Sequence, residues 1–239
     1  MTPLPNRLAS YAGALLLLQG LAACSSENNS ANQTIAETPG AQNNATAPSE
    51  AADGRLIVAF GDSLYAGYGV LPQQSFPARL EKALAARGVA ATVRNAGVSG
   101  DTSSAGLRRL AFTLDGLDRK PDLVMVNLGG NDMLRGIDPK ETRANLTAIC
   151  EELKRRGIPI LLTGMVAAPN MGRDYAERFN PIYAELAERY DAVLYPFFLD
   201  GVVTDQQLML PDRIHPNPAG IDSIVTKVTP LVASAVADE

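Results

Sequence analysis

Two polar motifs, far apart in the sequence, carry side chains that together could cleave an acyl bond. Ser63 is the third residue of the sequence GDSL, which directly follows the apolar run 56–60. A serine on a tight turn between a strand and a helix is well placed to act as a nucleophile, although serine is also a common helix N-cap. His215, the only histidine of the chain, follows Asp212 by three residues in PDRIHP. Asp212 can therefore accept a hydrogen bond from Nδ1 and leave Nε2 as a base toward Ser63.

Two segments between these motifs supply candidate hydrogen-bond donors. Asn131, in the sequence GGND, follows the apolar run 122–128 and offers amide N–H groups of the kind that stabilise an oxyanion. Residues 95–102, NAGVSGDT, present backbone N–H groups that form a candidate anion site. Each segment alone is ordinary for a turn. Their occurrence together with a serine and an Asp–His pair favours nucleophilic catalysis.

A regular alternation of segments after Arg55 predicts the framework that positions these residues. Short apolar runs indicate strands at 56–60, 92–95, 122–128, 158–163 and 192–194. Helical spacing, with Pro and Gly at the ends, indicates helices at 75–87, 102–114, 138–157, 174–189 and 217–236. This order predicts an α/β fold, a three-layer α/β/α flavodoxin-like sandwich with a five-stranded parallel sheet. In such a sheet the functional site lies at the carboxyl ends of the strands.

Composition excludes several other classes of function. The chain has 239 residues, 21 Lys and Arg against 26 Asp and Glu, and a net charge of −5, which argues against nucleic acid as a partner. One histidine and two cysteines argue against zinc, iron–sulfur and disulfide-scaffold proteins. The chain contains neither the Walker A motif nor the GxGxxG motif, which bind nucleotide cofactors. We therefore expect no metal and no cofactor. Cys150 lies in a helical pattern and is interpreted as a small buried hydrophobe.

The N-terminal sequence has the features of an export signal. Arg7 precedes the apolar stretch 8–21, which is too short to span a bilayer as a helix. The sequence LAAC, ending at Cys24, resembles the lipobox of bacterial lipoproteins, which implies a signal peptide over 1–24 and lipidation of Cys24. An ordinary signal peptide cleaved near Ala23 is the alternative. The expected location is periplasmic and lipid-anchored, and Ser25 after the cysteine favours the outer over the inner membrane.

Residues 25–54 differ in composition from the rest of the chain. They consist almost entirely of small and polar residues, and Ile35 is their one large aliphatic side chain. Such a segment buries too little apolar surface to offset its ordering entropy, so we expect a disordered linker. The expected organisation is therefore a signal peptide over 1–24, a linker over 25–54 and a single domain over 55–239.

The motifs GDSL, SGDTS, GGND and DxxHP, in this order, resemble those of the SGNH/GDSL hydrolases, and the resemblance extends from about residue 56 to the C-terminus. It implies Ser63 as nucleophile, His215 as general acid–base and Asp212 as the residue that orients His215. It also implies an oxyanion hole formed by the Ser63 and Gly100 N–H groups and the Asn131 side chain. Arg213 departs from the pattern, since the family member that this sequence most resembles has glycine there, and we expect a changed pocket rim.

The resemblance implies a hydrolase of carboxylic esters and thioesters, of the arylesterase, lysophospholipase or acyl-CoA thioesterase type, that works through an acyl-enzyme. Its expected partner is a small acyl ester or thioester, with membrane contact only through the lipid anchor and no obligate protein partner. The apolar loops 165–171 and 208–210 are candidates for an acyl groove or for core packing. Two alternatives remain: a carbohydrate O-acetyl esterase and a non-catalytic binding lipoprotein.

Overall fold

A computed structural model describes residues 54–237, all of which lie in the compact unit Ser49–Glu239. The expected signal peptide, Cys24 and the expected linker up to residue 53 lie outside the described residues. Within the described part, no helix is both long enough and apolar enough to cross a bilayer.

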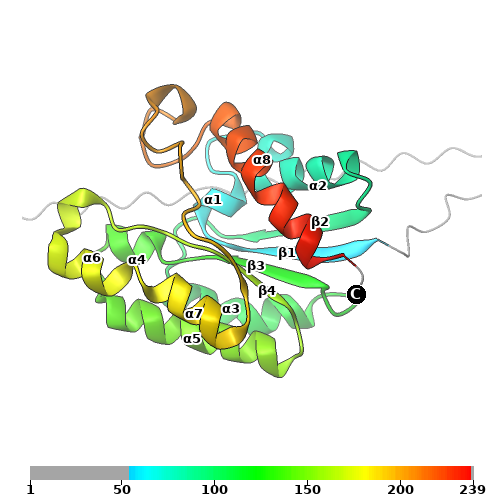
Figure 1. The fold of residues 1–239 in the computed structure, drawn as a ribbon, viewed down its shortest axis with the longest axis horizontal. Helices are drawn as coiled ribbons and strands as arrows, with labels where there is room; N and C mark the ends of the chain where they lie inside the picture. Colours follow the sequence, from blue (N-terminus) through cyan, green and yellow to red (C-terminus); the bar gives the residue numbers. More distant parts are fainter. Residues whose placement is uncertain (1–53, 238–239) are drawn as a thin grey trace, which may run out of the picture. The chain divides into compact units, whose positions relative to one another are not determined.

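A five-stranded parallel sheet forms the centre of the domain, which confirms the predicted fold class (Figure 1). The strands run in the spatial order β2-β1-β3-β4-β5. Their bounds are β1 Arg55–Gly61, β2 Ala91–Gly97, β3 Leu123–Asn127, β4 Ile160–Thr163 and β5 Val193–Tyr195. Every residue of β3 and β4 is buried, as expected for strands covered on both faces.

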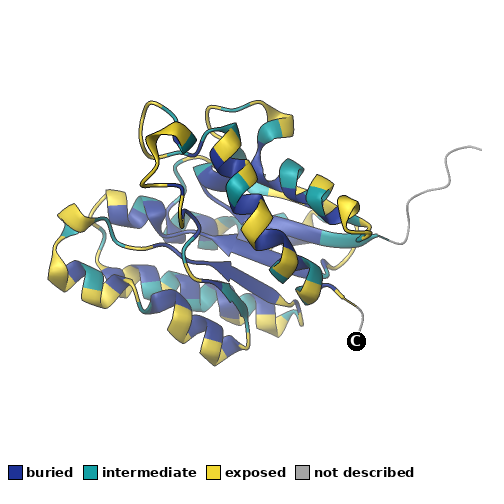
Figure 2. Ribbon diagram, turned by 45° about the horizontal axis from the view of Figure 1, so that its top comes forward, coloured by how far each residue is buried: buried dark blue, intermediate teal, exposed yellow. Residues whose placement is uncertain are grey.

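Helices cover both faces of the sheet and complete the three layers (Figure 1). On one face lie α2, Phe76–Ala86, and α8, Pro218–Ala235. On the other lie α3, Ser103–Asp115, α5, Pro139–Arg155, and α7, Ile182–Tyr190. Figure 2 shows that each helix turns buried residues toward the sheet and exposed residues outward. The apolar stripes recognised in the sequence are therefore the inner faces of these helices.

The structure corrects one helix and adds several short ones. The predicted helix 174–189 consists of two helices, α6, Arg173–Phe179, and α7. The break falls at Pro181, which has no N–H to continue the hydrogen-bond ladder of α6. The additional elements are too short to show a period in the sequence: α1 Ser63–Ala66, α4 Gly130–Leu134, η1 Pro72–Gln74, η2 Pro169–Met171 and η3 Gln206–Leu208.

The carboxyl ends of three adjacent strands lie in register, and this brings the predicted site residues together. Gly61, the last residue of β1, pairs with Gly97 of β2 and with Asn127 of β3. The loops that carry Ser63, Gly100 and Asn131 therefore start from one edge of the sheet. A side chain at position 97 would collide with the backbone of Ala66 in α1, so glycine permits the close approach of β2 to the serine turn.

Candidate active site

Ser63, His215 and Asp212 form one continuous hydrogen-bonded chain. Nε2 of His215 lies 2.8 Å from the Ser63 Oγ, and Nδ1 lies 2.7 Å from Oδ2 of Asp212. The serine is the first residue of α1, and only Asp62, the N-cap, separates it from the end of β1. With the proton on Nδ1, the imidazole donates to the Asp212 carboxylate and its Nε2 accepts from the serine hydroxyl. This geometry allows Ser63 to lose its proton as it attacks.

The loop around His215 is held together by local contacts. Oδ1 of Asp212 accepts hydrogen bonds from the backbone N–H groups of Ile214, at 2.9 Å, and His215, at 3.1 Å. Partial burial of the carboxyl acts to raise the pKa of Asp212, but these bonds and the imidazole outweigh it and hold the pKa below its ordinary value. Asp212 therefore remains ionised beside the imidazole at neutral pH. The ring of Tyr68 lies over that of His215, with 4.4 Å between centroids.

Gly100 and Asn131, which are expected to complete the oxyanion hole with the Ser63 N–H, line the same pocket as Ser63. Asn131 lies in the first turn of α4, after Gly129 in a left-handed conformation with φ of 108°. Gly100 has φ of 86°, a conformation that a residue with a side chain rarely adopts, and its carbonyl accepts from Nη2 of Arg135 at 2.8 Å. The structure thus brings the expected residues together in the lining of one pocket.

The pocket at this site has a volume of about 410 Å³ and a predominantly apolar lining. Its apolar and aromatic lining residues are Leu64, Tyr68, Met133, Leu134, Met165, Ala168, Leu199, Val203 and Ile214. The volume lies in the range of small-molecule sites, and the lining suits a hydrocarbon chain. Arg213 also lines the pocket, as expected for a rim position, in a left-handed conformation with φ of 58°.

The two apolar loops identified in the sequence, 165–171 and 208–210, pack against different parts of the site. Met165 and Ala168 line the pocket, so the first loop contributes to it. Met209 is buried and pairs with Pro216 in an antiparallel bridge, and Leu210 N–H donates to the His215 carbonyl at 2.8 Å. The second loop therefore braces the histidine loop. Sequence reasoning missed Met133, Leu199 and Val203, because residues that turn toward a pocket from short helices and turns leave no periodic signal.

A buried carboxylate joins the two segments that carry the oxyanion donors. Asp132, the residue after Asn131, is fully buried. It accepts hydrogen bonds from the Ser103 N–H, at 2.7 Å, from the Ser103 hydroxyl and from the Thr142 hydroxyl, at 3.1 Å. Ser103 stands three residues after Gly100. Asp132 thus fastens the loop of Gly100 to the helix of Asn131, and nothing in the sequence marked it for this role.

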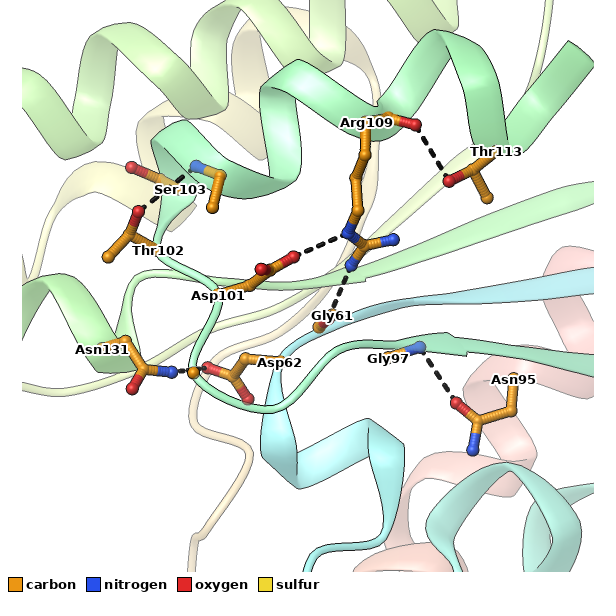
Figure 3. A network of polar contacts seen from close by, with 12 residues as sticks. Gly61, Asp62, Asn95, Gly97, Asp101, Thr102, Ser103, Arg109, Thr113 and Asn131 are labelled. Carbon is orange, nitrogen blue, oxygen red and sulfur yellow. Dashed lines mark hydrogen bonds and ion pairs between the residues drawn. The ribbon is translucent and has the colours of Figure 1, made fainter. Parts of the chain in front are cut away.

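A second polar network ties the Gly100 loop to the end of β1 (Figure 3). Nε of Arg109, in α3, pairs with the Asp101 carboxylate at 2.6 Å, and its Nη2 donates to the Gly61 carbonyl at 2.9 Å. The same guanidinium lies 4.1 Å from the centroid of the Phe60 ring. A planar guanidinium can form an ion pair and a hydrogen bond while one of its faces contacts an aromatic ring. The segment that directly follows Gly100 is therefore fixed at two points, Asp101 and Ser103.

Two other expectations concern metals and Cys150. Among residues 54–237, no cluster of three His, Cys, Asp or Glu side chains is arranged to hold a metal ion. Cys150 is a free, fully buried thiol on the inner side of α5, as its place in the helical pattern indicated. Burial raises the pKa of this thiol to about 12, so it stays protonated and unreactive at neutral pH.

Comparison with known proteins connects this geometry to a family. Residues 59–222 match the model of the GDSL-like Lipase/Acylhydrolase family. The chain is 38% identical over 194 residues to a protein of Vibrio mimicus named Arylesterase, covering 81% of this chain and 91% of that protein. It is 40% identical over 186 residues to Thioesterase 1/protease 1/lysophospholipase L1 of Escherichia coli (strain K12), covering 76% of this chain and 86% of that protein.

One solved structure is similar to this chain in both sequence and fold. It is that of AlinE4, described as an SGNH-hydrolase family esterase, and it is 51% identical to this chain. The match covers 78% of this chain and 98% of AlinE4, with a TM-score of 0.66. Sequence and structure comparisons therefore agree over nearly the whole described domain.

Proposed function

The chain belongs to the GDSL-like lipase/acylhydrolase family and is an esterase of that family, and on this premise we propose that it cleaves carboxylic esters and thioesters through an acyl-enzyme on Ser63. The observation that carries the proposal is the unbroken chain of hydrogen bonds from Asp212 through His215 to Ser63, with distances of 2.7 and 2.8 Å. A serine in contact with a correctly oriented imidazole is the signature of an activated nucleophile.

In the first half-reaction, Ser63 Oγ attacks the acyl carbonyl carbon while Nε2 of His215 takes the hydroxyl proton. The carbonyl oxygen becomes an anion and accepts hydrogen bonds from the N–H groups of Ser63 and Gly100 and from the Asn131 amide. When this intermediate collapses, the bond to the leaving oxygen or sulfur breaks, and His215 returns its proton to that atom. An alcohol or thiol departs, and the acyl group remains on Ser63 as an ester.

In the second half-reaction, water replaces the alcohol or thiol. His215 takes one proton from the water as its oxygen attacks the acyl-enzyme, and the same donors stabilise the second oxyanion. The bond to Ser63 Oγ then breaks, and His215 returns the proton to the serine. The products are a carboxylic acid and the free enzyme. Asp212 stays ionised throughout and stabilises the imidazolium that forms twice in the cycle.

The apolar pocket supports an acyl chain longer than acetyl as the recognised part of the substrate. Its lining offers aliphatic side chains and two methionines, Met133 and Met165, whose flexible thioethers adapt to chains of different length. A sugar-binding cleft would present many polar groups, so this lining disfavours a carbohydrate O-acetyl esterase. The names of the relatives from Vibrio mimicus and Escherichia coli support both aryl esters and thioesters as substrates.

The test is hydrolysis of p-nitrophenyl esters from acetate to palmitate, and of acyl thioesters, by the full chain beside Ser63→Ala. We expect turnover with an optimum at short to medium chains, and a loss of about 10⁴-fold or more in the variant. An active Ser63→Ala protein would remove the serine mechanism. Activity on acetylated sugars alone would select the carbohydrate esterase, and a folded chain without any hydrolysis would favour the binding lipoprotein.

We also propose that the mature chain is a periplasmic lipoprotein anchored through Cys24, in the outer membrane. The sequence LAAC and the polar segment that follows it support this proposal. A lipidated N-terminus followed by a flexible linker would hold the domain near the bilayer without inserting it. Mass spectrometry of the chain expressed in a bacterium should show a diacylglyceryl adduct on Cys24, and Cys24→Ala should release the protein from washed membranes. An unmodified N-terminus at residue 24 or beyond would refute the anchor.

A further inference from the structure

The Asp62 carboxyl lies directly before the nucleophile and takes no part in the proton path. Its side chain is buried, with 2% of the residue exposed. Oδ1 accepts a hydrogen bond from the Leu64 N–H at 3.0 Å. Oδ2 accepts one from Nδ2 of Asn131 at 3.1 Å, across 69 positions of sequence (Figure 3). Each carboxyl oxygen thus has its own donor, and one of these donors is the side chain expected in the oxyanion hole.

The contact matters because an asparagine amide can present either of two ends. Its oxygen and NH₂ group have nearly the same shape, and only the NH₂ group can stabilise an anion. An ionised carboxylate accepts hydrogen bonds and offers none, so it binds the NH₂ end of Asn131 and disfavours the reversed amide. One N–H is taken by Asp62. The second N–H of the same group stays available toward the pocket that Asn131 lines with Ser63 and Gly100.

We propose that Asp62 is a positioning residue that selects the orientation of the Asn131 amide in which an N–H faces the oxyanion, and that protonation of Asp62 removes this selection. With Oδ1 held by the Leu64 N–H, the proton lies on Oδ2 and is donated to the amide oxygen of Asn131, so the reversed amide becomes the favoured one. The inference rests on the proposed function, because it concerns the oxyanion hole of that reaction. It adds a residue that acts through Asn131 without touching the substrate.

The surroundings of Asp62 make its protonation responsive near neutral pH. Burial raises the pKa of this carboxyl to about 7, against the opposing effect of the bonds from Leu64 and Asn131. The charged groups that face it are Asp101, from the loop after β2, and Asp132, from α4, and both add to the rise. The neutral phenols of Tyr65 and Tyr183 also lie within electrostatic range of Asp62.

The substitution Asp62→Asn tests the selection with little change of shape. An amide has one acceptor oxygen, so it cannot serve both the Leu64 N–H and the Asn131 NH₂ group. With its oxygen on Leu64, its own NH₂ faces Asn131 and favours the reversed amide. We expect kcat to fall about 10²–10³-fold, the loss that follows removal of one oxyanion donor, with KM within about threefold. Asp122→Asn is the matched control, because Asp122 also accepts a backbone N–H, from Leu56, at the opposite end of β1.

A double-mutant cycle separates positioning from general structural damage. If Asp62 acts through Asn131, adding Asp62→Asn to Asn131→Ala lowers kcat no further than about threefold. Losses that multiply, or a kcat of Asp62→Asn close to wild type, would overturn the proposal. Loss of activity in Ser63→Ala, measured in parallel, keeps this result apart from the proposed function: an inactive wild type or an active Ser63→Ala would refute the function itself.

A second measurement needs no substitution at Asp62, so it tests the positioning role of Asp62 even if Asp62→Asn does not fold. The ratio of kcat for the wild type to kcat for Asn131→Ala isolates the contribution of the amide, because pH effects on the rest of the site are common to both proteins. We expect this ratio to be largest near pH 8 and to fall about five- to tenfold by pH 6, as Asp62 takes up a proton. A ratio that stays constant between pH 5.5 and 8.5 would overturn the proposal.

Discussion

The two sides of the active site are built in different ways. On the histidine side, Asp212 and His215 are three residues apart, and the Asp212 carboxylate binds the backbone of the loop as well as the ring. On the oxyanion side, Asp62 reaches Asn131 across 69 positions and Asp132 reaches Ser103 across 29. The first arrangement is local and partly exposed, whereas the second is tertiary and buried.

This difference separates what each side contributes to the protein. Polar groups in a buried network must all be satisfied, so the oxyanion side couples catalysis to the stability of the core. The histidine loop exposes Asp212, whose side chain is 33% accessible, so water can take the place of a hydrogen bond that a substitution removes there. We therefore expect substitutions in the loop to affect turnover far more than folding, and substitutions of the buried carboxylates to affect folding strongly.

The largest effect should come from Asp212→Asn. The amide cannot stabilise the imidazolium as the carboxylate does, and it can hold the ring in the wrong tautomer. We expect kcat to fall about 10³–10⁴-fold, while the free energy of unfolding changes by less than about 1 kcal/mol. Steady-state kinetics and urea unfolding check the two halves. A loss of several kcal/mol in stability would show that the histidine loop is not an independent local unit.

Asp132→Ala should reverse that pattern of effects. It leaves the Ser103 N–H and the hydroxyls of Ser103 and Thr142 without their buried acceptor. We expect the free energy of unfolding to fall by about 3 kcal/mol or more, as measured by urea denaturation. Asp205→Ala, which removes an exposed cap of η3, is the control and should cost no more than about 1 kcal/mol. Equal losses in the two variants would contradict a special role for the buried network.

The pH dependence of stability gives a third test, because Asp62 titrates differently in the two states. Its pKa is raised to about 7 in the folded chain from an ordinary value of 3.8. Between these values the folded protein holds a proton that the unfolded chain has released, so stability falls as pH rises through this window. Between pH 5 and pH 8 we expect the wild type to lose about 2–3 kcal/mol more unfolding free energy than Asp62→Asn. Parallel pH profiles of the two proteins would contradict the assignment.

The same contrast explains what could be predicted from the sequence. The strands, most helices and the pair Asp212 and His215 follow from short-range patterns, because side-chain period and local spacing are visible within a few residues. The motif of Asn131 indicated an amide donor, but its partner Asp62 lies in a different motif. Only the register of β1 with β3 brings the two together. Pocket residues such as Leu199 come from turns without a period, so sequence spacing alone could not place them.

The smallest effect concerns the backbone of the histidine loop. Arg213 and Asp191 are the two described residues other than glycine that have a positive φ, of 58° and 52°. A side chain is strained in this conformation and glycine is not, although glycine also gains entropy when the chain unfolds.

We therefore expect Arg213→Gly to raise the free energy of unfolding by roughly 0.5–1 kcal/mol. Asp191→Gly, at the end of α7, should give a similar gain and serves as the matched control. Asp212 binds the backbone N–H groups of Ile214 and His215, which follow Arg213 in the chain. We therefore expect His215 to keep its position in Arg213→Gly. We expect kcat for a neutral p-nitrophenyl ester to stay within about twofold of wild type in both variants. A large loss of turnover in Arg213→Gly alone would mean that the arginine side chain, and not the Asp212 carboxylate by itself, sets the position of the imidazole.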